Sequence, residues 1–400
     1  MPRERINIGS LFRPHLTKKS GVAVLRITQI YNYLAPPTTG GHRYERQMAE
    51  ALGSMEDVRF RRVALHKRLA WLRRYVMPIE NLRALPMLKG EDLVIFNSSQ
   101  YHYMLPLMAM LKPLLKGRMA VTHHHFEGLT ARGATGRFRA HLEHKMLSMA
   151  DIIIAPSKYV EDECRRRWPE KRIFYWPIPF VSLPEEANGS RKCLPEDLEQ
   201  EGDAISKEGL LRIVSVGSIE PRKGYERLLQ AMAMLRERNI RVHLEIAGRE
   251  RSEAYAEALH RYASANHLDV TFRGYVSDEE KRAFYSSGDI YAMSSVAEGF
   301  GIVMAEAMGE GLPVVAFDNS GIPYTVKHEV NGLLVSEGDL AGYADAITRL
   351  VEDPSLRRRL GEGARATRAA LPTYDDFRQS IQASLKDLEC RSDRSSDSLD

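Results

Sequence analysis

Short apolar runs rich in β-branched residues alternate with segments of helical period along most of the chain. This alternation is the pattern of parallel strands joined by helices. Strands are predicted in the first half at Val22–Ile30, Val58–Leu65, Leu93–Asn97, Met119–Thr122, Ile152–Ala155 and Arg172–Trp176. Strands are predicted in the second half at Arg212–Val216, Val242–Ala247, Val270–Phe272, Ile290–Met293, Val314–Ala316 and Leu333–Val335. The predicted fold class is therefore α/β, with a parallel sheet in each half.

The pattern is interrupted once, at residues 184–209, which are polar, acidic and without an apolar period. A chain of 400 residues also exceeds what one hydrophobic core usually spans, about 250–300 residues. We therefore expect a linker at 184–209 between two doubly wound domains, with a ligand cleft where the carboxyl ends of both sets of strands meet. Two amphipathic helices, Leu356–Ala370 and Tyr374–Leu388, follow the last strand, and residues 391–400 are expected to form a disordered tail.

Composition argues against a structural zinc site, a signal peptide and a membrane span, but it does not indicate a function. The three cysteines, Cys164, Cys193 and Cys390, show no metal-binding spacing, which favours a reducing, cytoplasmic setting and argues against structural zinc. The apolar run Gly21–Ile30 contains an arginine and no cleavage site follows it, so no signal peptide is expected. The uncharged stretch Leu93–Leu111 is too polar in its middle for a membrane span.

The net charge of +4 hides an asymmetry between the halves. Residues 1–200 carry a surplus of 12 positive charges and residues 201–400 an excess of 8 negative ones. The segment 58–76 concentrates arginines around Trp71 and Tyr75. Nucleic acid, an anionic membrane surface, a phosphorylated substrate and a merely solvated face all fit such charge.

The segment VSVGSIEPRKGYERLLQAM, residues 214–232, places Gly217 and the pair Arg222 and Lys223 between a strand and a helix. Unpaired N–H groups and the dipole at a helix start favour anions, so a diphosphate site is plausible here, beside the simpler interpretation of two solvated cations in a turn. The spacings of a P-loop and of a dinucleotide fingerprint are both absent.

A second constellation is SSVAEGFGIVMAEAMGEGLPVVA, residues 294–316. Glu298 precedes two glycines at a predicted helix start, and Glu306 follows inside that helix. A carboxylate there can accept hydrogen bonds from the two hydroxyls of a ribose. The alternatives are a helix cap for Glu298 and a surface charge for Glu306, but apolar sequence surrounds Glu306.

The E-x7-E arrangement of EGFGIVMAE resembles that of the family 4 retaining glycosyltransferases, also called glycosyl transferases group 1. The segments VGSIEPRKG, FRGYVSDEE and HEVNGLLV stand in family order, so residues 211–372 resemble that family's nucleotide-sugar-binding domain. In the first half, TTGGHRYERQMAEAL resembles the family's glycine loop and PSKYVEDECRRRW its serine-plus-helix segment.

The resemblance implies the GT-B fold, two Rossmann-like domains that face a central cleft. An acceptor-binding domain would span residues 1–183, a donor-binding domain 210–372, and a helix at 373–390 would cross back to the first domain. It further implies transfer of a sugar with retention of configuration from a nucleotide-diphosphate sugar to an acceptor hydroxyl, with no cofactor and no metal.

Carried over by position, Lys223 and Arg222 would neutralise the donor diphosphate, and Glu298 would contact hydroxyls of the sugar. Glu306 would hold the ribose, and His124, two residues after a threonine, would lie near the transferred sugar. The implied donor-binding positions are Gly40, Gly41, Gly217, Ser218, Arg222, Lys223, Gly274, Tyr275, Glu298, Phe300, Gly301 and Glu306.

One position departs from the family. Many members have an arginine directly after the first glycine of this loop, where this chain has Ser218. Arg222 and Arg249 are the two candidates for the missing charge.

The run VTHHHFEG, residues 121–128, offers a competing metal hypothesis together with His141 and His144. Successive strand residues point to opposite faces, so the three consecutive histidines are not expected to share one site. Two rival functions also remain: a GT-B-like epimerase or phosphorylase, and a nonenzymatic nucleic-acid-binding protein that uses the basic half.

The last expectation concerns location. Residues 1–150 hold a surplus of 14 positive charges in the domain that would face the acceptor. We expect reversible docking on the anionic inner face of the cell membrane and a glycan or lipid-linked acceptor, with no nucleic-acid partner. This placement favours cell-envelope polysaccharide or lipopolysaccharide assembly.

Overall fold

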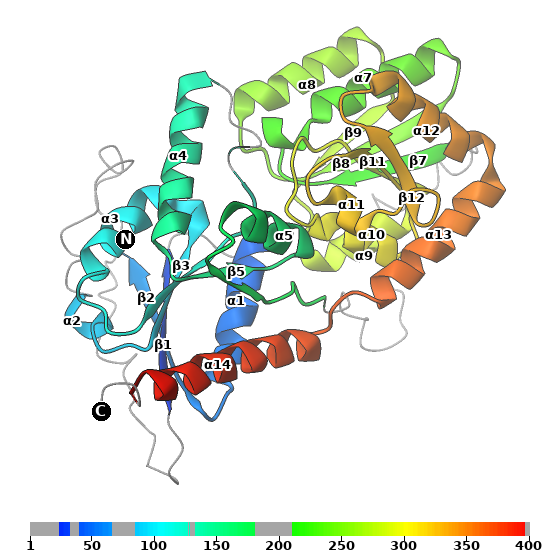
Figure 1. Cartoon of the computed structure of the whole chain (residues 1–400). Helices are drawn as coiled ribbons and strands as arrows, with labels where there is room; N and C mark the ends of the chain where they lie inside the picture. The colour runs from blue at the N-terminus through cyan, green and yellow to red at the C-terminus, as the bar shows by residue number, and fades with distance from the viewer. Residues whose placement is uncertain are drawn as a thin grey trace, which may run out of the picture.

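The computed structural model describes residues 24–32, 40–65, 85–126, 128, 133–180 and 210–396. These residues form two lobes, each built on a parallel six-stranded sheet between layers of helices (Figure 1). The predicted linker at 184–209 and the aromatic part of the basic segment, residues 66–76, lie outside the described residues.

The N-terminal lobe has the strand order β2-β1-β3-β4-β5-β6. Its strands are β1 (Leu25–Asn32), β2 (Val58–Leu65), β3 (Leu93–Asn97), β4 (Arg118–Thr122), β5 (Ile152–Ala155) and β6 (Arg172–Tyr175). Its helices are α1 (Gly40–Gly53), α2 (Leu85–Leu88), α3 (Tyr101–Leu111), α4 (Gly133–Met149) and α5 (Lys158–Arg167), with a 3-10 turn, η3, at Ser98–Gln100.

The C-terminal lobe has the strand order β12-β11-β10-β7-β8-β9. Its strands are β7 (Leu211–Val216), β8 (Val242–Ala247), β9 (Val270–Gly274), β10 (Ile290–Met293), β11 (Val314–Asp318) and β12 (Gly332–Ser336). Its helices are α7 (Tyr225–Glu237), α8 (Glu253–Ala265), α9 (Asp278–Ser286), α10 (Ile302–Gly309), α11 (Ile322–Thr325), α12 (Leu340–Glu352) and α13 (Pro354–Ala369), with a 3-10 turn, η5, at Pro221–Lys223.

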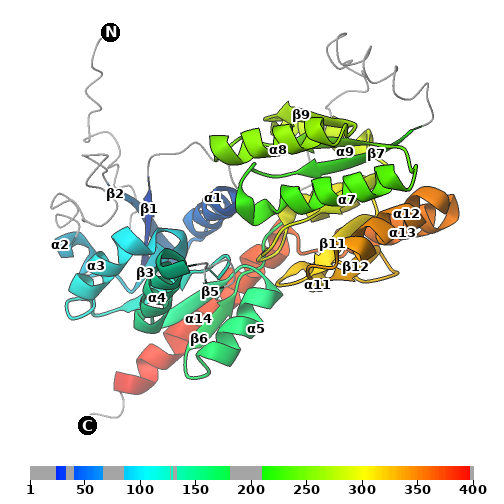
Figure 2. The same ribbon diagram turned by 90° about the horizontal axis from the view of Figure 1, so that it is seen from above.

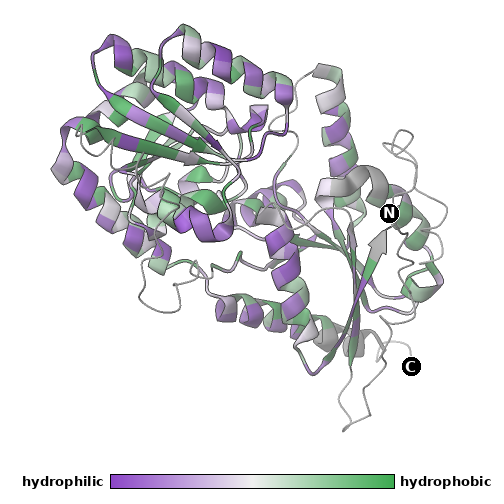
Figure 3. Cartoon of the chain, turned by 180° about the vertical axis from the view of Figure 1, so that it is seen from behind, coloured by the Kyte–Doolittle hydropathy of each residue, from purple (hydrophilic) through white to green (hydrophobic). Residues whose placement is uncertain are grey.

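Each sheet is buried on both faces, as expected for parallel strands covered by helices. In β3, Leu93 and Ile95 belong to one apolar cluster and Val94 and Phe96 to another, because successive side chains point to opposite faces. Figure 3 shows the same division, with apolar residues on the strands and polar ones on the outer surfaces of the helices.

The α/β prediction is confirmed, and every predicted strand is present with small changes of boundary. Among the described residues the first strand runs over Leu25–Asn32, and residues 22–23 of the predicted strand Val22–Ile30 lie outside them. Its parallel pairing with β2, from Leu25 opposite Val58 to Asn32 opposite Leu65, sets these limits. Local apolar pattern does not contain that pairing information.

The last helix, α14 (Tyr374–Ser396), lies against the N-terminal lobe although it follows the C-terminal one (Figures 1 and 2). Phe377 and Ile381 are buried in the same cluster as Ile27 and Trp176. The Trp176 indole donates a hydrogen bond to the Ser384 hydroxyl at 3.0 Å. The core of the N-terminal lobe is therefore completed by the end of the chain.

The prediction of a disordered tail from residue 391 is wrong for residues 391–396, which continue α14. Extending an existing helix adds one hydrogen bond per residue, whereas only nucleation is costly, so a polar sequence can continue a helix that packing has already started. Residues 397–400 lie outside the described residues.

Candidate functional site

The turn after β7 brings two cations to the carboxyl end of the second sheet. Arg222 and Lys223 lie in η5, which ends at Gly224 in the left-handed region, with φ of 63°. A side chain at Gly224 would meet the carbonyl oxygen of Ser294, since an added Cβ would lie 2.3 Å from it. Glycine thus lets this turn pack directly on the loop that follows β10.

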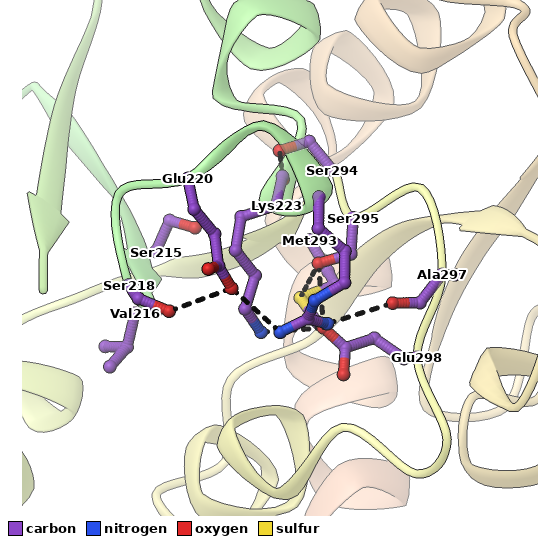
Figure 4. Close-up of polar contacts among 12 residues, drawn as sticks. Ser215, Val216, Ser218, Glu220, Lys223, Met293, Ser294, Ser295, Ala297 and Glu298 are labelled. Carbon is purple, nitrogen blue, oxygen red and sulfur yellow. Dashed lines mark hydrogen bonds and ion pairs between the residues drawn. The ribbon is translucent and has the colours of Figure 1, made fainter. Parts of the chain in front are cut away.

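The cations meet Glu298 from that neighbouring loop (Figure 4). The Lys223 Nζ lies 2.6 Å and the Arg222 Nη1 3.1 Å from the same oxygen, Glu298 Oε1. The Ser295 hydroxyl donates to that oxygen at 3.0 Å. Arg222 also pairs with Glu220 at 3.1 Å. We call Glu220, Arg222, Lys223 and Glu298 the ion cluster, whose formal charges cancel.

Burial and charge oppose each other in the ion cluster. Burial alone would raise the pKa of Glu298, but Lys223 and Arg222 outweigh it and hold that pKa at about 2. Burial lowers the pKa of Lys223, and Glu298 counteracts the effect. At neutral pH the Glu298 carboxylate is therefore ionised, and it can accept hydrogen bonds from hydroxyls of a bound molecule.

Ser218, where the family has an arginine, donates to Glu220 Oε1 at 3.1 Å and adds no charge. Gly217 lies against the Lys223 side chain, whose Cε would be 3.1 Å from an added Cβ. Both predicted donor residues therefore adjoin the ion cluster.

The two lobes touch where Glu298 leads into α10. An added Cβ at Gly299 would lie 1.9 Å from the carbonyl oxygen of His124, which belongs to the other lobe. The hydroxyl of Ser157, also in the N-terminal lobe, donates to the Gly299 carbonyl at 2.7 Å. Gly301 caps the N-terminus of α10 with φ of 80°, a left-handed conformation that glycine adopts without strain. The close approach of two backbones here requires glycine.

Glu306 is 8% exposed and lies inside α10, as its apolar surroundings predicted. The Tyr285 hydroxyl donates to its Oε2 at 2.9 Å. Arg43 of α1 reaches across the cleft to its Oε1 at 3.2 Å and to Asp278 at 2.7 Å. Burial and the nearby carboxylate raise the pKa of Tyr285 well above its ordinary value, so its hydroxyl stays a donor.

The N-terminal lobe brings Gly41 and His124 together across from the ion cluster. The His124 Nε2 lies 3.7 Å from the position of an added Cβ at Gly41 and 3.5 Å from Glu45 Oε1. The ring of Tyr44 packs edge-on against the imidazole at 5.4 Å between centroids. Glu45 is itself held by Gln29 and by Asn97, which donates at 2.8 Å.

Gly40 contacts the first residue of α10, since an added Cβ would lie 2.6 Å from Ile302 Cδ1. The Phe300 ring packs against that of Phe180, with 5.1 Å between centroids. Gly274 ends β9 with φ of 69°, and Tyr275 after it is 53% exposed. The Arg249 guanidinium lies 4.0 Å from the Tyr275 ring centroid.

The three consecutive histidines occupy different environments. His123 is fully buried and hydrogen-bonded to Ser98 at 2.9 Å, and burial holds its pKa well below the ordinary value. Burial, with Arg222 adding, lowers the pKa of His125 to about 4. His144 packs on Trp168 at 5.2 Å. Within the described part of the chain no three ligating side chains are grouped as a metal site.

Three residues were not among the predicted site residues: Arg43, Tyr285, and Ser157, which is the serine of the PSKYVEDECRRRW segment. The contacts of Arg43 with Glu306 and of Ser157 with Gly299 span 263 and 142 residues of sequence, whereas that of Tyr285 with Glu306 spans 21. Arg43 follows the glycine pair closely, which was its only local signal.

In the described residues, no helix is long and apolar enough to cross a bilayer.

Two family models match the chain, one in each lobe. Residues 30–179 match the model described as Glycosyltransferase Family 4, and residues 198–367 match Glycosyl transferases group 1. The chain belongs to the family 4 glycosyltransferases. The resemblance drawn from the E-x7-E segment is thereby confirmed.

Curated members of the family match over part of their length. The chain is 35% identical over 153 residues to an uncharacterized glycosyltransferase of Methanocaldococcus jannaschii, covering 38% of this chain and 39% of the relative. It is 34% identical over 155 residues to the lipopolysaccharide core biosynthesis glycosyltransferase LpsE of Rhizobium meliloti, covering 39% and 44%. These matches thus span about two fifths of the relatives.

Solved structures match over nearly the whole chain. Sucrose-phosphate synthase from Thermosynechococcus elongatus has a TM-score of 0.71 at 22% identity, covering 92% of this chain and all of that one. HepE of Anabaena, solved with UDP and glucose, has a TM-score of 0.68 at 18% identity, covering 91% and 100%. At such identities the likeness shows the fold, which is GT-B, as predicted.

Proposed function

We propose that this family 4 member transfers a sugar from a nucleotide-diphosphate donor to an acceptor hydroxyl, with retention of configuration and without a metal. The observation that carries the proposal is the ion cluster at the carboxyl end of the second sheet, facing His124 and the glycine pair of the first lobe. Sheet-edge clefts of this kind are where doubly wound folds bind ligands.

The donor is proposed to lie along the second lobe. Glu306 accepts from the ribose hydroxyls, and the backbone at Gly274 and Tyr275 meets the base. Tyr285 keeps the Glu306 carboxylate oriented through its 2.9 Å hydrogen bond. Arg43 must shift toward Asp278 when the ribose takes its place on Oε1, since Arg43 contacts both carboxylates. UDP in the HepE structures is consistent with such a donor.

The diphosphate is proposed to lie between Lys223 and the glycine pair Gly40–Gly41, with backbone of Phe300 and Gly301 beside it. Arg222 already serves two carboxylates, Glu220 and Glu298. Arg249 lies on an aromatic ring and forms no ion pair with a carboxylate among the described residues. We therefore assign the charge missing at Ser218 to Arg249 rather than to Arg222.

Catalysis in this proposal is electrostatic. As the bond between the sugar carbon and the phosphate oxygen breaks, negative charge grows on the diphosphate beside Lys223, and a preorganised cation there lowers the barrier. The acceptor oxygen attacks the same face, and its proton passes to the departing phosphate oxygen. Glu298 holds hydroxyls of the sugar while His124 positions it from the other lobe.

The proposed setting is cell-envelope glycan assembly on the inner face of the membrane. LpsE acts in lipopolysaccharide core biosynthesis by its name, and a 38% identical relative from Mycobacterium leprae, matched over 151 residues, is a phosphatidyl-myo-inositol mannosyltransferase. The basic surplus of residues 1–150 supports this setting. Flotation should recover the protein with anionic vesicles and less with neutral ones; equal recovery would contradict the docking.

A thermal-shift screen of nucleotide-diphosphate sugars tests the activity. A true donor at one hundred times its dissociation constant should stabilise the fold by about 2.7 kcal/mol, and Lys223→Ala should reduce this shift only in part. Transfer measured with the selected donor should be unchanged by EDTA. Loss of transfer in EDTA, restored by a divalent ion, would contradict the metal-free mechanism.

A further inference from the structure

A groove of 330 Å³ lies between the lobes, beside Glu306 and away from the ion cluster. Arg43 and Gln47 line it from α1, Glu306 of α10 and Glu310 just after that helix line it too, and so do residues 178–180. Arg365 and Arg368 line it from α13. The groove therefore has walls from both lobes and from the segment where the chain leaves the first.

The two carboxylates of the groove are already satisfied. Glu306 receives Arg43 at 3.2 Å and the Tyr285 hydroxyl at 2.9 Å. Glu310 receives the Ser286 hydroxyl at 2.8 Å and lies 3.4 Å from Arg282 Nε. Each glutamate thus has an arginine of its own, and neither needs the cations of α13.

Arg365 and Arg368 are the two arginines of the groove that are not ion-paired with its glutamates. Three positions apart on a helix, they share one face. Arg365 donates to the backbone carbonyl of Glu310 at 3.2 Å, and the Arg368 guanidinium lies 5.1 Å from the Phe180 ring centroid. Within the described ranges neither forms an ion pair with a carboxylate. Burial lowers the pKa of Arg368, and an arginine still keeps its charge.

Arg368 is attracted by the Glu306 carboxylate, but neither it nor Arg365 forms an ion pair among the described residues, so the two guanidinium groups can still bind a doubly charged oxyanion. Guanidinium groups bind phosphate through paired hydrogen bonds, more specifically than a lysine does. Arg282, which pairs with Glu310, also lines the groove, and Ile178, Pro179 and Ile302 form an apolar part of its wall. A volume of 330 Å³ is at the small end of ligand pockets and exceeds what a bare phosphate fills.

We propose that this groove, which borders the proposed donor site at Gly40 and Glu306 but does not include Lys223, is a second ligand site for a phosphomonoester of monosaccharide size. Its phosphate binds between Arg365 and Arg368, and its organic part lies against Pro179 and Ile302. Because both lobes line the groove, the bound ligand stabilises the arrangement in which the lobes are together. This site does not depend on the proposed transfer reaction.

Calorimetric titration with ribose 5-phosphate tests the site, with ribose as the neutral probe. Wild type, Lys223→Ala and the control Arg358→Gln, an exposed arginine of α13 outside the groove, should bind ribose 5-phosphate within about twofold of one another. Arg365→Gln/Arg368→Gln should bind more than about tenfold more weakly, and ribose should not bind.

Three results would overturn the proposal: no heat with wild type at millimolar ribose 5-phosphate, loss of binding in Lys223→Ala, or unchanged binding in the double glutamine variant. Arg365→Lys/Arg368→Lys keeps the charge without the paired geometry and should fall between wild type and the glutamine variant. Unaltered circular dichroism and thermal midpoints show that each variant is folded. No sugar nucleotide is used, so the titration tests this groove even if the proposed transferase activity is not found.

Discussion

Both lobes have loops at the same cleft, but the interactions that stabilise these loops differ between the lobes. The C-terminal lobe uses charges, with Glu298 ion-paired to Lys223 and Arg222 and its pKa held at about 2. The N-terminal lobe uses buried neutral groups, with His123 and His125 kept uncharged by burial. A charged substrate thus meets a fixed ion cluster on one side and, on the other, a wall in which these two imidazoles carry no charge.

The largest expected effect comes from breaking the contact between the lobes. Gly299→Ala would place a methyl group 1.9 Å from the His124 carbonyl and so force the lobes apart. We expect kcat/KM of transfer to fall at least 100-fold, because misplacement by about 1 Å is enough for such a loss. Gly53→Ala is the matched control, since its added Cβ would be 3.7 Å from the nearest side chain. Equal activity of both variants would show that the lobes do not need this contact.

Removing the charge on the donor side should have the next largest effect. Lys223→Ala is expected to lower kcat by about 100-fold or more and to weaken binding of the donor less, because the diphosphate gains charge toward the transition state. Steady-state kinetics measure kcat and the Michaelis constant separately. If the Michaelis constant alone rose, Lys223 would be a binding group without a catalytic role.

The pH dependence of stability distinguishes the two lobes. The pKa of His125 is lowered from 6.5 to about 4, so the unfolded state binds more protons between these values, and stability present above pH 6.5 is lost as pH falls toward 4. The loss is at most about 3 kcal/mol. The Glu298 contribution persists until pH falls below about 4.5 and is lost toward pH 2.

Urea unfolding at pH 7 and pH 4.5 measures this difference. His125→Gln should reduce the drop in the free energy of unfolding, and the exposed His141→Gln should leave it unchanged. An equal drop in all three proteins would place the acid sensitivity elsewhere.

The smallest expected effect is on donor affinity alone. Glu306→Gln keeps the shape and a hydrogen-bond acceptor for Tyr285 but loses the charge that pairs with Arg43. We expect about tenfold weaker binding of the donor and little change in the thermal midpoint. Unchanged affinity in titration calorimetry would remove Glu306 from the ribose site.

The fold was predictable because its signal is local. Each predicted strand is an apolar run, and the parallel order follows from the helices between strands. The contacts of Glu298 and Glu306 were only half predictable: their positions show in sequence, but their partners do not. Arg43, Ser157 and the backbone of His124 contact the second lobe only after both lobes have folded. Local hydrophobic periodicity contains no information about such contacts.

The crossing of α14 has a consequence for the order in which the protein is made. Phe377, Ile381 and Leu385 fill the core of a lobe whose strands end at Tyr175, so a ribosome must synthesise the entire second lobe before the first can finish folding. Until then a nascent chain exposes the apolar surface around Trp176, which invites chaperone binding and aggregation. A truncation after residue 372 should therefore damage the lobe it does not touch in sequence, and expression of residues 1–183 alone should give insoluble protein.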